Sequence, residues 1–79
     1  MKFANREQVM NLRKTYPKGT RVELVQMDDP QAPPEGTLGT VQGVDDTGSI
    51  LIAWDNGNRL NVVYGVDYVR IVNRETEGR

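Results

Sequence analysis

Short alternations of apolar and polar residues run along most of this chain and predict β-strands separated by tight turns. The clearest run is T-L-G-T-V-Q-G-V-D-D-T-G-S-I-L-I-A-W-D-N-G at 37–57. It contains two predicted strands, 38–44 and 49–54, joined by the turn sequence D-D-T-G, and it ends in the Asn-Gly pair of a tight hairpin. Further alternating segments predict strands at 20–26, 59–64 and 68–72.

The apolar side chains of these strands predict one hydrophobic core, because residues two apart on a strand point to the same face of a sheet. Gly39 and Gly43 lie inside the strand 38–44, where glycine allows a strand to bend or bulge. We therefore expect a strongly curled sheet. The predicted core consists of Val22, Leu24, Val41, Val44, Ile50, Ile52, Trp54, Leu60, Val62 and Ile71.

A short α-helix is predicted before the strands, over residues 5–16. Asn5 and Gln8 have the spacing of a capping box at its start. Pro17 ends it, because the residue before a proline is disfavoured in the helical conformation. Since the helix is otherwise polar, its apolar stripe should pack on the strands that follow. The stripe consists of Val9, Leu12 and Tyr16.

The order of these elements predicts a mainly β fold, a five-stranded SH3-like barrel with a short N-terminal α-helix. The barrel covers residues 19–72, and a barrel of this kind removes exposed sheet edges. The whole chain, 1–79, forms a single domain, and the polar segment 73–79 is a flexible tail. The longest irregular segment is the proline-rich loop Met27–Gly36.

The composition argues against an enzyme. The chain contains no His and no Cys, which removes the usual zinc ligands and the usual partners of a nucleophile. The acid pairs 28–29 and 45–46 have the residue types of turns, and neighbouring residues on a strand point to opposite faces. We therefore predict no catalytic residue, no metal site and no cofactor.

The same composition predicts a cytoplasmic protein without a membrane partner. The longest apolar stretch, Ile50–Trp54, is far too short to span a bilayer. The first residues lack the apolar core of a signal peptide, and a small secreted domain would ordinarily contain disulfides.

The net charge of −1 conceals three blocks of charge. Residues 1–21 contain six Lys or Arg and one acid, residues 22–58 contain seven acids and no base, and residues 59–79 contain four Arg and three acids. An acidic surface on a small rigid fold suits a basic protein partner. The predicted partner-binding residues are Asp28, Asp29, Pro30, Pro33, Pro34, Glu35, Asp45 and Asp46.

Nucleic-acid binding is the alternative, because the basic N-terminal block could contact phosphates. The central block opposes it, since a nucleic-acid-binding barrel needs a basic stripe. The same side chains also suit a solvated helix face. The predicted nucleic-acid-binding residues are Arg6, Arg13, Lys14, Lys18 and Arg21.

Two short motifs resemble those of known small barrels. The segment G-T-L-G-T-V-Q-G-V at 36–44 is similar to the first half of KOW and CAP-Gly barrels, in which glycines bend a strand. The segment I-A-W-D-N-G at 52–57 is similar to a hairpin of the Mib-Herc2 type. Both resemblances imply a fold more than a function.

Longer motifs cover most of the chain: F-A-N-R-E-Q-V at 3–9, Y-P-K-G-T-R-V-E-L at 16–24, M-D-D-P-Q-A-P-P-E-G-T-L-G-T-V at 27–41, W-D-N-G at 54–57 and G-V-D at 65–67. Together they resemble a family of small domains in Gram-positive bacteria and their phages or mobile elements, domain of unknown function family 4314. The resemblance implies a source and no activity. We therefore predict a small interaction module of a phage or mobile genetic element, with inhibition of a host nucleic-acid-binding protein as one role.

Overall fold

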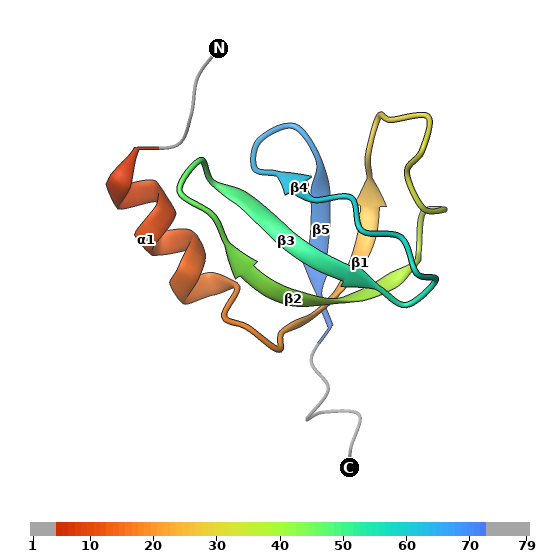
Figure 1. The fold of residues 1–79 in the computed structure, drawn as a ribbon, viewed down its shortest axis with the longest axis horizontal. Coiled ribbons are helices and arrows are strands. Elements are labelled where there is room, and N and C mark those ends of the chain that lie inside the picture. The colour runs from red at the N-terminus through yellow and green to blue at the C-terminus, as the bar shows by residue number, and fades with distance from the viewer. Residues whose placement is uncertain (1–4, 73–79) are drawn as a thin grey trace.

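A single antiparallel sheet, curled around its own core and flanked by one helix, makes up the part of the chain that the computed structural model describes, residues 5–72 (Figure 1). The strand order across the sheet is β4-β3-β2-β1-β5, so the last strand returns to pair with the first. The elements are α1 (Arg6–Thr15), β1 (Arg21–Gln26), β2 (Leu38–Val44), β3 (Ser49–Trp54), β4 (Val62–Val63) and β5 (Tyr68–Ile71).

The mainly β class, the helix and the five strands are confirmed, but β4 is much shorter than the strand predicted at 59–64. Local hydrogen bonds use the backbone that would otherwise pair with β3. The amide of Leu60 donates to Asn58 Oδ1 at 2.8 Å, and its carbonyl accepts from Trp54 Nε1 at 2.9 Å. The strand therefore starts only at Val62.

The two outer strands, β4 and β5, approach each other without forming a ladder in the described residues. One isolated bridge, between Tyr64 and Asp67, lies in the turn that joins them. The sheet is therefore curled but not closed, and a closed SH3-like barrel stays a prediction. The predicted tail at 73–79 lies outside the described residues.

The core consists of side chains from the strands and from the predicted apolar stripe of the helix. Its buried side chains are Val9, Leu12, Val22, Leu24, Val41, Val44, Ile50, Ile52, Trp54 and Val62. The predicted core positions Leu60 and Ile71 are wrong: Leu60 is half-buried and Ile71 is 45% exposed. Ile71 ends β5, an edge strand of the described sheet that is paired on one side only, with β1, and Val9 and Leu12 of the helix supply the missing apolar area.

The helix is capped as its sequence predicts and is held next to β2. The amide of Gln8 donates to Asn5 Oδ1 at 2.8 Å, and the amide of Asn5 donates to Gln8 Oε1 at 2.9 Å, which completes the capping box. After the helix, the amide of Gly19 donates to the carbonyl of Val41 at 2.8 Å. This bond places the helix exit beside the middle of β2.

The curl of the sheet requires glycine at position 39. Gly39 is buried between Val22 of β1 and Trp54 of β3, with which it is paired, and a Cβ added there would lie 2.7 Å from Ile52 Cγ2 and 2.7 Å from Trp54 Cε3. Real side chains essentially never approach this closely, and both neighbours belong to the packed core.

We predict that Gly39→Ala lowers the free energy of unfolding by about 2 kcal/mol, because Ile52 and Trp54 must move to admit one methyl group. Urea denaturation followed by Trp54 fluorescence measures the change. Gln42→Ala is the control, since Gln42 is exposed on the same strand. Equal free energies of unfolding for the two variants would show that Ile52 and Trp54 can move to admit the methyl group without loss of stability.

Candidate functional site

The proline-rich loop between β1 and β2 is a folded structure held by the sheet. The amide of Gly36 donates to the carbonyl of Leu24 at 2.8 Å and closes the base of the loop. Asn58 Nδ2 donates to the carbonyl of Gln31 at 2.8 Å and ties the loop to the segment after β3. At the tip, Asp29 Oδ1 accepts from the amide of Gln31 at 2.8 Å, the Asx turn expected of an aspartate at such a position.

This loop presents most of the predicted partner-binding residues to solvent, with one correction. Pro33 is buried, so its assignment as a contact residue is wrong. It faces inward because the loop is anchored on both sides, and a proline side chain is apolar enough to pack there. The exposed members of the predicted set in this loop are Asp28, Asp29, Pro30, Pro34 and Glu35.

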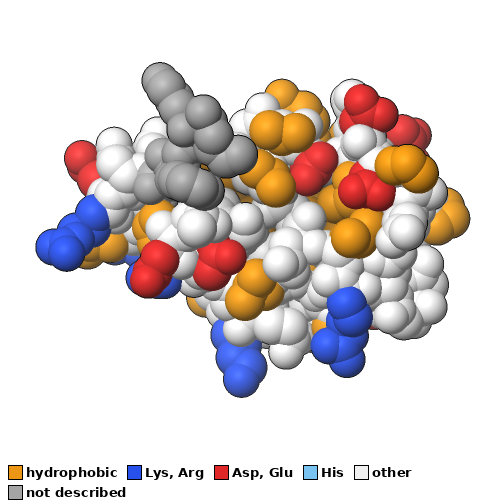
Figure 2. All heavy atoms as spheres, turned by 45° about the horizontal axis from the view of Figure 1, so that its top comes forward, with side chains coloured by type: hydrophobic (Ala, Val, Ile, Leu, Met, Phe, Trp, Pro, Cys, Tyr) orange, Lys and Arg blue, Asp and Glu red, His pale blue; other side chains and the backbone are white. Residues whose placement is uncertain are grey.

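Exposed apolar side chains lie next to the loop. Gln26 pairs with Tyr68, so β5 starts beside the point where the loop leaves β1. Tyr68 is 51% exposed and Val66, on the preceding turn, is 61% exposed. Figure 2 shows hydrophobic and acidic side chains together over this end of the molecule. We call this surface the acidic end; it consists of Val25, Asp28, Asp29, Glu35, Val66 and Tyr68.

The apolar part of the acidic end follows only partly from sequence. The alternation in β1 places Val25 on the outer face, and Tyr68 starts a predicted strand, but neither signal says that the two lie beside the loop. Their position depends on the pairing of β5 with β1, which includes a register shift between Leu24 and Gln26. No sequence pattern indicated that Val66 would belong to this surface, because it lies in a turn and not in an alternating segment.

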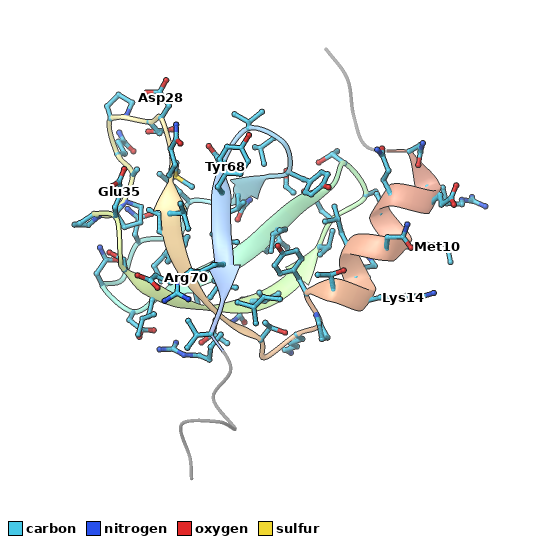
Figure 3. The ribbon with its side chains drawn as sticks, turned by 180° about the vertical axis from the view of Figure 1, so that it is seen from behind. Met10, Lys14, Asp28, Glu35, Tyr68 and Arg70 are labelled. Carbon is cyan, nitrogen blue, oxygen red and sulfur yellow. The ribbon has the colours of Figure 1, made fainter. Side chains whose placement is uncertain are left out.

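The basic residues of the helix lie at the other end of the molecule. Figure 3 shows Met10 and Lys14 on α1, well separated from Asp28 and Glu35 on the loop. Three of the predicted nucleic-acid-binding residues are exposed and form no ion pair among the described residues. These are Arg6, Lys14 and Lys18.

Arg13 connects the helix to the sheet. Its Nε and Nη2 donate to the carbonyl of Val44 at 3.1 and 2.9 Å, and Nη2 lies 3.0 Å from Asp46 Oδ1. This side chain therefore fastens α1 to the end of β2. The ion pair joins Arg13, a predicted nucleic-acid-binding residue, to Asp46, a predicted partner-binding residue.

Two more ion pairs link segments that are distant in sequence. Arg21 reaches Asp55 at 2.7 Å and also donates to Thr40 Oγ1 at 2.9 Å. Arg70 of β5 reaches Glu23 of β1 at 2.6 Å. Hydrogen bonding to Arg21 lowers the pKa of Asp55 below its usual range, and partial burial opposes this. These two pairs neutralise Asp55 and Glu23, which belong to the central block of acids that contains no base.

Asp45 organises the turn between β2 and β3. Its Oδ1 accepts from the amide of Thr47 at 3.0 Å, from the hydroxyl of Thr47 at 2.7 Å and from the amide of Ser49 at 2.9 Å. Burial raises the pKa of Asp45, but the hydrogen bonds together lower it by more, so the pKa lies below the usual value. The prediction that Asp45 contacts a partner is not supported by this geometry, which accounts for its side chain within the turn.

No metal or membrane feature occurs in the described residues. In 5–72, no three acids lie close enough together to hold a metal ion, and no helix there has the length and apolarity needed to cross a bilayer.

One comparison with known proteins is informative. A family model described as "Domain of unknown function (DUF4314)" matches residues 5–72, which is most of the chain and the whole of the described sheet and helix. No curated protein and no solved structure matches.

We predict that Arg13→Ala lowers the free energy of unfolding by about 1 kcal/mol, because the carbonyl of Val44 loses both of its side-chain donors. Asp46→Ala should cost less than about 0.5 kcal/mol, since its carboxylate is almost fully exposed. Urea denaturation of both variants measures the difference. Equal losses would mean that the ion pair, and not the bond to the carbonyl, holds the helix.

We predict that Asp45→Asn makes stability less sensitive to acid. A carboxyl whose pKa is lower in the folded state contributes stability above its unfolded pKa, about 3.9, and loses it as the pH falls through the folded value. The urea midpoint of the wild type should therefore fall more steeply than that of the variant between about pH 5 and pH 2. A wild-type slope for Asp45→Asn would refute the assignment.

Proposed function

Because the chain belongs to the DUF4314 family, whose description names no activity, we propose its function from its surfaces. The protein is a small, non-enzymatic interaction module that acts in the cytoplasm and binds a basic protein surface through the acidic end. Its source is a phage or a mobile genetic element. A nucleic-acid-binding protein presents a surface of the required charge, so the module suits the role of an inhibitor of such a protein.

The distribution of unpaired acids carries this proposal. Of the seven acids in the central block, Glu23, Asp46 and Asp55 form ion pairs and Asp45 is used by its turn. The other three acids, Asp28, Asp29 and Glu35, form no ion pair among the described residues and share one loop. The negative potential is therefore concentrated at one end.

The composition of the acidic end supports a protein partner. Protein interfaces combine an apolar centre, often with aromatic residues, and a polar rim. Here Tyr68, Val66 and Val25 supply exposed apolar area, and the carboxylates of the loop flank it. Since the loop is already folded and anchored, little conformational entropy is lost when a partner binds.

Nucleic-acid binding by the helix is the second candidate, and one observation favours it. Arg6, Lys14 and Lys18 are exposed and have no ion-pair partner among the described residues. Three cations contribute modest, strongly salt-dependent affinity for phosphates. Arg13 does not belong in a test of this candidate, because its removal also loosens the helix.

We predict that a bacterial protein retained by the immobilised chain binds about tenfold more weakly to the isosteric triple variant Asp28→Asn, Asp29→Asn, Glu35→Gln. Asparagine at position 29 still accepts the Asx-turn hydrogen bond, so the loop keeps its fold. Affinity capture from a Gram-positive lysate, followed by titration of the captured protein at low and high salt, measures the effect. Glu7→Gln, an exposed acid on α1, is the matched control and should bind like the wild type.

Retention of full affinity by the triple variant would refute the proposal, as would the absence of any captured protein. The same preparations are titrated with labelled single- and double-stranded DNA and RNA. Salt-dependent binding that is lost in Arg6→Gln, Lys14→Gln, Lys18→Gln would assign the function to the helix instead.

A further inference from the structure

All three tyrosines of the chain line one groove, between α1 and the turn that joins β4 to β5. Two adjoining hollows, of about 280 and 190 Å³, share Tyr16 and Tyr64 as their common wall. The first is bordered by the helix residues Asn11 and Thr15, and the second reaches Tyr68. The groove follows the gap where the sheet does not close.

The lining of the groove combines aromatic rings with neutral polar groups. Tyr64 is 57% exposed, so its ring forms a wall of the groove without filling it. Tyrosine offers a large rigid contact area and a polar hydroxyl at low entropic cost. Asn11 and Thr15 of α1 also line the groove. The Asn11 amide can bond to a peptide backbone, and Thr15 Oγ1, which donates to the carbonyl of Asn11 at 3.0 Å, can accept a hydrogen bond from one. Such walls suit a peptide, which combines apolar side chains with the amide groups of its backbone.

The charge around the groove selects a cationic occupant. Among the described residues, Asp67 is the charged side chain that lines it, and no Lys or Arg does so. Asp67 Oδ2 accepts from the amide of Val63 at 3.0 Å, which leaves Oδ1 for a cation. Tyr68, at the far end, pairs with Gln26, from which the chain continues directly into Asp28 and Asp29. A phosphate backbone would meet negative charge here, whereas a lysine or arginine side chain would meet its complement.

We infer that this groove binds an extended peptide segment of a partner protein, with apolar side chains between the tyrosines and a Lys or Arg directed to Asp67 and the loop. The juxtaposition of Tyr16, Tyr64 and Tyr68 with the acidic end carries this inference. It rests on the proposed function and adds to it the form of the ligand and the site of its apolar residues.

The test uses a library of random peptides displayed on phage and selected on the full chain. Enriched sequences should place apolar residues beside Lys or Arg. A synthetic peptide of the enriched sequence, carrying a fluorophore, is then titrated by anisotropy. We predict that Tyr64→Ala and Tyr68→Ala each weaken its binding about tenfold or more. Tyr64→Phe, which keeps the ring, should stay near the wild type.

Val63→Ala is the matched control and should bind like the wild type, because Val63 is exposed on β4 and does not line the groove. The urea midpoint of every variant is compared with the wild type, so that loss of fold is recognised. Enriched peptides that are acidic, or that bind Tyr64→Ala and Tyr68→Ala normally, would overturn the inference. So would binding of single-stranded oligothymidine that depends on the same tyrosines.

The loop variant separates this inference from the proposed function. Peptide binding that falls in the triple variant and is unchanged in both tyrosine variants would overturn the groove and leave the acidic end as the binding surface. Peptide binding that falls in Tyr64→Ala, which lies outside the acidic end, and is unchanged in the triple variant would support the groove and refute a role of the loop carboxylates.

Discussion

The packing of the Ile52 and Trp54 side chains over Gly39, which is paired with Trp54 in the sheet, is the constraint on which the rest of this structure depends. A chain of this size must fold its one sheet over itself, because a flat sheet would leave an apolar face in water. The absence of a side chain at Gly39 lets Ile52 and Trp54 fill the inside of the bend. The indole of Trp54 in turn holds the carbonyl of Leu60, which delays the start of β4.

A curled sheet that does not close has an open side, and the helix and the tyrosines lie along it. Val9 and Leu12 complete the core from the helix, and Arg13 fixes the helix to the end of β2. What remains between the helix and the turn after β4 is a groove bordered by Tyr16 and Tyr64. The candidate peptide site is thus a consequence of how the sheet ends, since a complete ladder between β4 and β5 would fill that space.

Local signals in the sequence predicted the helix and the strands well, but they predicted poorly how these elements contact one another. The capping box at Asn5 and the strands 38–44 and 49–54 depend on residues near one another in the chain, and they match the structure. The exposure of Ile71 and the burial of Pro33 depend on which strand lies at an edge and on how a loop is anchored. Periodicity carries no information on either, because both are set by pairing between distant segments.

Charge counts along the sequence are limited in the same way, because they do not show which charges become paired in the fold. This pairing explains why the acidic end is small. Counting along the chain gives seven central acids without a base, which suggests one broad acidic face. The topology brings bases from the flanking blocks onto this region: Arg13 and Arg21 arrive from the helix side and Arg70 from β5. Exposed pairs of this kind add little stability, yet they remove charge from the surface. The loop escapes neutralisation because no strand pairs with it in the described part of the chain, and for this reason the proposed partner-binding surface lies at the loop and not over the whole central block.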